Sequence, residues 1–164
     1  MAREYIGSDW FLEEPDIEEE QYEGRPRRAA ETIPHLLGRA IFGGFFLYNG
    51  INHFVQRRNL ASYAGMKGVP KPDLAVELSG AMMLAGGLSL LTGYRPKIGS
   101  ALITAFLVGV SPQMHAFWKE NDPQRRQGEM VNFMKNVALV GASLLAAGSR
   151  QPWPLAAGQH QTAA

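Results

Sequence analysis

The chain has 164 residues and a formal net charge of +1, because 16 Lys and Arg nearly balance 15 Asp and Glu. This length is typical of one domain of roughly 100 to 200 residues, and its basic residues are scattered, which argues against nucleic-acid binding. The chain contains no cysteine, which excludes disulfides, thiolate nucleophiles and cysteine-ligated zinc or iron–sulfur clusters.

Residues 1–33 are predicted to form an acidic N-terminal tail, rich in Asp and Glu up to Glu23. A secretory signal needs a basic start followed by an apolar stretch, so no cleavage is expected here. The composition is typical of a solvated, mostly disordered segment. A second interpretation stays open, in which embedded apolar residues dock the tail on a partner with a basic, apolar groove. The partner-docking candidates are Trp10, Phe11, Leu12 and Tyr22.

Four apolar windows follow, at residues 34–54, 74–94, 96–118 and 130–148. A helix of about 20 residues at ~1.5 Å rise spans the ~30 Å hydrocarbon core of a bilayer. Four such windows in so short a chain would leave a soluble protein too little polar surface. The sequence therefore predicts an all-α fold: a four-transmembrane-helix antiparallel bundle over residues 34–148, between the largely irregular N-terminal tail and a C-terminal tail at residues 149–164.

Small residues recur at four-residue spacing in every predicted helix, and in lipid such ridges let helix backbones approach closely. The predicted ridges are Ala40 and Gly44; Ala81, Ala85 and Ser89; Ala101, Ala105 and Gly109; and Ala138, Ala142 and Ala146.

The connections between the windows carry turn and cap signals. Asn59 is predicted to cap a short helix over residues 60–67, which Gly68 ends. The segment GYRPK, after the second window, is predicted to be a short turn. Asp122, directly before Pro123, is predicted to start the last helix.

Polar residues gather at the helix ends that an antiparallel bundle brings to one membrane surface. In the segment NGINHF, Asn49, Asn52 and His53 are spaced i, i+3, i+4 and share one helical face. Gln113 is one of the polar residues at this surface. The candidate site residues there are Asn49, Asn52, His53, Glu77, His115, Trp118, Glu129, Asn132, Lys135 and Asn136. A charge near hydrocarbon is costly alone, so Lys135 is expected to pair with Glu77 or Glu129. At the opposite surface, Arg39 is expected to snorkel to the headgroups.

Three interpretations of this polar cluster remain open. The first is an interhelical hydrogen-bond clasp, with each bond contributing ~0.6 kcal/mol. The second is a pocket that binds a quinone headgroup, a proton or a small polar ligand. The third is a metal site, in which His53 and His115 converge with two carboxylates. No HExxH or ExxH spacing supports the third, so no metal ligand is assigned.

Three segments of the chain resemble a known family: GRAIFGGFFLYNGINHF, AGMKGVPKPDLAVELSGAMMLAGGLSLLTGYRPKIGSALI and MHAFWKENDPQRRQGEMVNFMKNVALVGASLL. They are similar to the DoxX family of small four-span bacterial and archaeal membrane proteins over residues 37–147. The resemblance implies a four-helix integral membrane fold and an association with membrane redox systems, since the family name traces to a quinone-linked oxidoreductase. It transfers no catalytic residue. The family's polar positions are matched by His53, Glu77, His115, Trp118, Asn132, Lys135 and Asn136.

Two functional interpretations follow. The favoured one is an accessory or structural subunit of a respiratory or photosynthetic, quinone-linked membrane electron-transfer complex, and not an enzyme on its own. A chain without cysteine, a flavin motif or clear metal ligands has no visible electron carrier. The alternative is a quinone-interacting oxidoreductase component that uses the polar pocket. No covalently bound cofactor is expected; quinone or lipid are the candidate ligands, and the lipid bilayer and other membrane subunits are the expected partners.

The expected location is the bacterial inner membrane, as a multi-pass protein. The basic residues divide evenly between the two surfaces of the predicted bundle, so the positive-inside rule assigns no orientation. Cytoplasmic termini are favoured, because an uncleaved acidic tail is easier to leave untranslocated.

Overall fold

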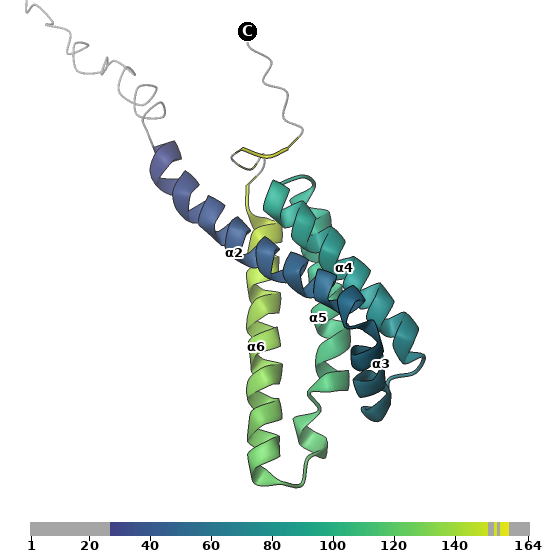
Figure 1. Ribbon diagram of the computed structural model, residues 1–164. Helices are drawn as coiled ribbons and strands as arrows, with labels where there is room; N and C mark the ends of the chain where they lie inside the picture. Colours follow the sequence, from purple (N-terminus) through teal and green to yellow (C-terminus); the bar gives the residue numbers. More distant parts are fainter. Residues whose placement is uncertain (1–26, 151–152, 154, 158–164) are drawn as a thin grey trace, which may run out of the picture. The chain divides into compact units, whose positions relative to one another are not determined.

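The computed structural model describes residues 27–150, 153 and 155–157, with side chains from Thr32 onward (Figure 1). The chain divides into two units, residues 1–34 and 35–164. In the first unit the described part is the start of one helix, and the contacts given below belong to the second. The partner-docking candidates Trp10, Phe11, Leu12 and Tyr22 lie outside the described residues, as does most of the acidic tail.

The described part of the chain is helical, with no strand among its residues, which confirms the all-α prediction. Its elements are α2 (Arg27–Val55), α3 (Arg57–Met66), α4 (Pro72–Thr92), α5 (Pro96–Met114), the 3₁₀ turn η2 (Phe117–Lys119) and α6 (Pro123–Gly148).

Three stretches of the described chain are long and apolar enough to cross a membrane: Pro72–Thr92, Pro96–Lys119 and Pro123–Gly148. They correspond to α4, to α5 with η2, and to α6. Helix α2 is not among them, because Arg39, Asn49 and His53 lower the hydropathy of its otherwise apolar run. That α2 is a fourth membrane span therefore stays a prediction.

The predicted helix ends are largely confirmed. Helices α4, α5 and α6 each begin with a proline in the first turn, where the missing N–H is tolerated. Asp122 caps α6 as predicted, its carboxylate accepting from the Arg125 backbone N–H at 2.8 Å. Gly68, at φ 80°, follows α3 as predicted. The predicted Asn59 cap is wrong, because α3 begins at Arg57, two residues earlier, and Gln56 precedes it without a side-chain cap.

The third helix is shorter than predicted. It was expected to run to Trp118, but α5 ends at Met114 and a separate 3₁₀ turn follows. Pro112 lies inside α5, and its ring removes one helical N–H and crowds the preceding turn. His115 then leaves the helical conformation, at φ −124° and ψ 48°, while its N–H still donates to the Ser111 carbonyl at 2.9 Å. The chain therefore turns at His115 instead of continuing the helix.

Helix α5 packs between α4 and α6, and the part of α2 from His35 onward runs obliquely across the bundle (Figure 1). The buried core joins residues of α2, α4 and α5 with one tryptophan that follows α6. Its members are Phe46, Met83, Leu90, Ile103, Leu107 and Trp153. Helix α6 adds the partly buried Leu139, Val140 and Ala146, which pack against this core.

Helices α2 and α4 meet backbone to backbone at glycines. A Cβ atom added to Gly43 would lie 2.8 Å from the Leu91 backbone nitrogen and 2.9 Å from the Gly87 carbonyl oxygen. One added to Gly50 would lie 2.8 Å from the Leu84 backbone nitrogen. Separations this short have no room for a side chain, so these glycines allow the two helices to approach closely.

Most of the predicted small-residue ridges are wrong, because they do not lie on the face of the helix that packs against a neighbouring helix. A Cβ atom on Gly44 or Gly109 would meet nothing within 4 Å, and Ala81 and Ala85 are exposed. Ser89 and Ala146 are exceptions: a Cβ atom on Gly99 would lie 2.5 Å from the Ser89 hydroxyl oxygen, and Ala146 packs against the core. Small residues occur on several faces of each helix, so their spacing did not identify the face that packs.

Adjacent glycines of α2 provide a matched test of this contact. We expect Gly43→Ala to destabilise the protein by about 1–3 kcal/mol, because the new methyl group overpacks a backbone contact. Gly44→Ala adds the same methyl group in open space and is expected to be neutral or stabilising, because alanine favours a helix more than glycine does. Thermal unfolding of both variants in the same detergent measures the difference, and equal midpoints would contradict the proposed contact.

Candidate functional site

A cavity of about 260 Å³ lies among α2, α3, α4 and α5. Its walls are mainly apolar, and His53, Ser79 and Gln113 are its polar side chains. The lining residues are His53, Leu60, Ala64, Val69, Ala75, Val76, Leu78, Ser79, Met82, Ala105, Phe106, Gly109, Val110, Gln113 and Met114. An apolar pocket with a few polar groups is the usual form of a small-molecule site, although this one is just below the common range of about 300–1,000 Å³.

His53 is the one candidate from the NGINHF segment that lines this cavity. It packs directly on α4, since a Cβ atom on Gly80 would lie 3.0 Å from the His53 Cβ. Its Nδ1 lies 2.9 Å from the Asn49 carbonyl oxygen, and a carbonyl only accepts, so Nδ1 carries the proton. The imidazole is also edge-on to Phe106, with ring centroids 6.4 Å apart. These contacts fix the ring and leave Nε2 without a hydrogen bond among the described residues.

The other two polar side chains of the cavity, Ser79 and Gln113, differ in whether they are free to hydrogen-bond to a ligand. The Ser79 hydroxyl donates to the Val76 carbonyl at 3.0 Å, within its own helix. The Gln113 amide makes no hydrogen bond with any described residue and is exposed. His53 and Gln113 are therefore the side chains that can offer hydrogen bonds to a molecule in the cavity.

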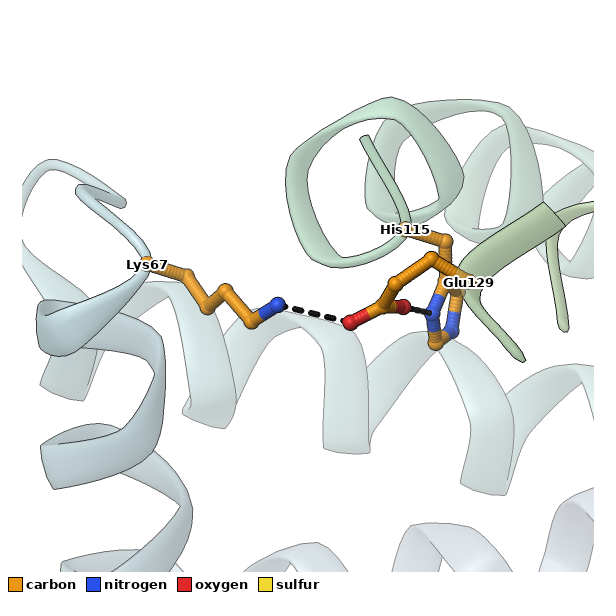
Figure 2. A network of polar contacts seen from close by, with 3 residues as sticks. All are labelled: Lys67, His115 and Glu129. Carbon is orange, nitrogen blue, oxygen red and sulfur yellow. Dashed lines mark hydrogen bonds and ion pairs between the residues drawn. The ribbon is translucent and has the colours of Figure 1, made fainter. Parts of the chain in front are cut away.

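Glu129 holds together three segments near this cavity. One carboxylate oxygen accepts from Lys67 Nζ at 2.8 Å, and the other accepts from His115 Nδ1 at 2.7 Å (Figure 2). Lys67 follows α3, His115 follows α5, and Glu129 belongs to α6. The Glu129 side chain is only 18% exposed, so these charged hydrogen bonds are stronger than pairs at an open surface.

The ammonium of Lys67 lies outside the three apolar spans. The hydrogen bond to Glu129 raises the pKa of Lys67 above its ordinary value, and this outweighs the opposing effect of partial burial. Lys67 is therefore charged whenever the network is formed at neutral pH. Val69, two residues after Lys67, lines the cavity. Gln113 and Met114, directly before His115, line it too. The residues of the network are therefore close in sequence to residues of the cavity wall.

A second, weaker set of ion pairs fixes the start of α3. Arg57 lies 2.8 Å from Glu77 and 3.5 Å from Asp73, both in α4. All three side chains are at least a third exposed, and pairs of this kind contribute about 0–1 kcal/mol. Leu60 and Ala64 of α3 line the cavity, so α3 covers it while being held by ion pairs near each of its ends.

The predicted polar cluster is thus divided into separate groups. The Asn49 amide donates to the Phe45 carbonyl at 2.8 Å, and Asn52 accepts from Gln56 at 2.7 Å, so both bond within or next to their own helix. Trp118 belongs to an aromatic cluster, with its ring centroid 5.0 Å from Phe117 and 5.8 Å from Phe133. Asn49, Asn52 and Trp118 make no hydrogen bond with a described residue of α6.

The predicted partner of Lys135 is wrong. Glu77 pairs with Arg57, and Glu129 pairs with Lys67 and His115. Lys135, Asn132 and Asn136 make no hydrogen bond or ion pair with any described residue. The convergence of His53 and His115 on two carboxylates also fails, because no group of three or more His, Asp or Glu forms in the described chain. Lys67 took the expected place of Lys135 because its long side chain reaches α6 from the end of α3.

Arg39 does not snorkel to the headgroups, contrary to prediction. It is only 7% exposed, and its guanidinium donates to the Leu90 carbonyl at 3.2 Å and the Leu91 carbonyl at 2.9 Å. These are among the last carbonyls of α4, which lack helical partners and attract positive charge. Arg39 therefore stabilises the end of α4 inside the protein.

Trp153, from the predicted C-terminal tail, completes this buried arrangement and was missed by the sequence reasoning. Its ring lies 5.6 Å from the Arg39 guanidinium carbon and 4.7 Å from the His35 ring. Its indole N–H donates to the Ser149 hydroxyl at 2.7 Å, and it is 3% exposed. An aromatic residue between two prolines, just after an apolar helix, was the available signal that this segment packs on the bundle.

Neutralising Glu129 tests the three-residue network. We expect Glu129→Gln to destabilise the protein by about 1–3 kcal/mol, because two charged hydrogen bonds lose their acceptor charge. Glu120→Gln is the matched control, since this nearby carboxylate makes no hydrogen bond or ion pair with a described residue. Unfolding in detergent measures both variants, and an equal loss in the two would show that the network contributes nothing.

The raised pKa of Lys67 predicts a dependence on alkaline pH. The stability that Lys67 contributes is complete below its ordinary pKa of 10.5 and is lost as the pH rises through the raised value. The difference in unfolding free energy between the natural protein and Lys67→Met should therefore shrink in strongly alkaline buffer. Lys97→Met, which removes a lysine without an ion pair among the described residues, is the control. A difference that stays constant would contradict the role of Lys67.

Comparison with known proteins identifies a family. The family model described as DoxX matches residues 35–116, half of the chain. This is shorter than the resemblance expected from the sequence, but it contains every residue that lines the cavity and stops before Glu129 and α6. No curated protein and no solved structure matches the chain. With its three apolar helices, the protein is a multi-pass membrane protein in contact with the lipid bilayer, and the chain belongs to the DoxX family.

Proposed function

We propose that this protein is a four-span subunit of a quinone-linked membrane electron-transfer complex, and that its cavity holds the ring of a quinone. The observation that carries this proposal is the apolar cavity with His53 and Gln113 as its available polar groups. Membership of the DoxX family supports it, because the family is often linked to redox and quinone-related functions. The electron carriers would then belong to other subunits, consistent with a sequence that has no cysteine.

The chemistry of a quinone suits both polar groups. Its flat ring is apolar, and its two oxygens are carbonyls when oxidised and hydroxyls when reduced. With Nδ1 committed to the Asn49 carbonyl, a neutral His53 offers Nε2 as an acceptor for a hydroxyl, and a protonated one offers a donor for a carbonyl. The Gln113 amide can also accept or donate. His53 and Gln113 can therefore hydrogen-bond to both the oxidised and the reduced form of a quinone.

The internal contacts of α2 support its assignment as the fourth span. In lipid, every polar group needs a partner inside the protein. Arg39 is buried against the end of α4, and Asn49 and His53 bond to carbonyls of their own helix. Each of these three residues, which lower the hydropathy of α2, thus has at least one polar group bonded inside the protein. We extend the proposal to a bacterial inner membrane with both termini cytoplasmic.

A structural accessory subunit without a ligand is the second candidate. It is favoured by a separate observation: Asn132, Lys135 and Asn136 of α6 make no hydrogen bond or ion pair with a described residue. A subunit of that kind needs neighbours in the membrane but no binding cavity. Ligand binding by the isolated protein therefore separates the two candidates.

Titration with a short-chain benzoquinone tests the cavity. Binding to the purified protein in lipid nanodiscs is measured by calorimetry, and we expect His53→Phe to raise the Kd about tenfold, because one hydrogen bond of about 1.4 kcal/mol is lost. Asn52→Ala is the matched control, since Asn52 neighbours His53 but does not line the cavity. If the natural protein binds no quinone, the structural accessory role is the better description.

A further inference from the structure

Three polar side chains of α6 have no hydrogen-bond or ion-pair partner in the described chain. Asn132 and Lys135 are exposed and Asn136 is half-buried, and the spacing i, i+3, i+4 puts them on one side of the helix. We call them the α6 polar face. None makes a hydrogen bond or an ion pair with a described residue.

The depth of this face makes the lack of a partner costly. The apolar window of α6 begins at Met130, after Arg125, Arg126 and Glu129. Lys135 lies five residues further on, roughly 8 Å into the window at ~1.5 Å per residue. A lysine inside the hydrocarbon costs up to about 2.5–3.5 kcal/mol on insertion scales, the value for the centre of a helix. Lysine can reduce this by reaching toward the headgroups. The short amides of Asn132 and Asn136 have no such reach, so they require a polar partner within the membrane.

Two carboxylates of the described chain near this end of the bundle are already engaged, and a third, Glu120, precedes α6 and makes no ion pair with Lys135. Glu129 binds Lys67 and His115, and Glu77 binds Arg57. Transferring either of them to Lys135 would break an existing ion pair and would leave another charge without its partner. The charge of the α6 polar face is therefore best complemented from outside the described part of the chain.

We propose that the α6 polar face docks on a transmembrane helix of another protein, and that this helix carries an Asp or Glu at the depth of Lys135. The carboxylate would pair with the ammonium, while the amides of Asn132 and Asn136 would bond to polar groups of the same helix. Such interhelical bonds are the means by which polar residues join helices in lipid. The inference rests on the proposed function only in requiring a larger membrane complex, and it is independent of what the cavity binds.

A second copy of this chain fits the same face poorly. Copies of one membrane protein share one orientation, so a two-fold contact through α6 sets each residue near its own counterpart. Lys135 would then lie near the Lys135 of the other copy, and like charges would repel in a medium of low dielectric constant. Anionic lipid is also a poor complement, because a headgroup lies beyond the reach of Asn136. A partner helix with a carboxylate satisfies all three side chains.

Two valines of α6 provide matched positions for photo-crosslinking. Val131 lies four residues before Lys135 and shares its side of the helix, whereas Val137 lies two residues after it, on the other side. The two are similarly exposed, at 41% and 46%. A photoreactive amino acid is placed at either position in the full chain, the native membranes are irradiated, and the crosslinked peptides are identified by mass spectrometry.

We expect Val131, and not Val137, to crosslink to a transmembrane peptide of another protein with an Asp or Glu within one helical turn of the crosslink. Lys135→Glu should abolish the crosslink, and replacing that carboxylate with Lys in the same cells should restore it. Lys135→Met should also abolish it while leaving the unfolding of the purified protein unchanged, because Lys135 has no contact to lose.

Three outcomes would overturn the inference: crosslinks from Val131 only to lipid, crosslinks to α6 of a second copy, or a partner peptide whose charge exchange fails to restore the contact. The quinone titration is measured on the purified protein and does not depend on these crosslinks. A failure of docking with intact quinone binding therefore rejects this inference and leaves the cavity proposal standing.

Discussion

The close contact of α2 with α4 is the constraint on which the rest of the described structure depends. Glycines at Gly43, Gly50 and Gly87 let the two backbones touch, which fixes how α2 is rotated. That rotation buries Phe46 in the core and sets His53 against Gly80, at the wall of the cavity. In lipid, apolar side chains gain little by leaving the acyl chains, so close backbone packing is what can select one arrangement of the helices.

The two ends of the bundle are held by different interactions. At one end, Arg39 and Trp153 are buried and joined to the last turn of α4. At the other, α3 is attached mainly by ion pairs, of which the Arg57 pairs are exposed. The buried contacts of Arg39 and Trp153 hold their end of the bundle rigidly. The weaker and more exposed contacts of α3 are typical of segments that open locally. The cavity lies at the second end, where a ligand needs access.

The sequence was sufficient for most of the helical elements, but not for the pairing of side chains. Apolar windows, the Asp122 cap and Gly68 predicted features that arise from local chemistry, and the structure confirms them. The partner of Glu129 depends on which long side chain reaches it in space, and the sequence pointed to Lys135 where the structure has Lys67. The break after Pro112 likewise turns His115 toward Glu129, which a continuous helix to Trp118 would not predict.

The contact between Arg39 and Trp153 has a consequence for how the chain is made. Arg39 belongs to the first described helix, whereas Trp153 follows the last one. During synthesis, the guanidinium of Arg39 can reach the end of α4 as soon as that helix exists, but its aromatic neighbour emerges only after α6. The environment of Arg39 is therefore completed by one of the last described residues to leave the ribosome, so insertion of the helices into the membrane precedes the closing of this end of the bundle.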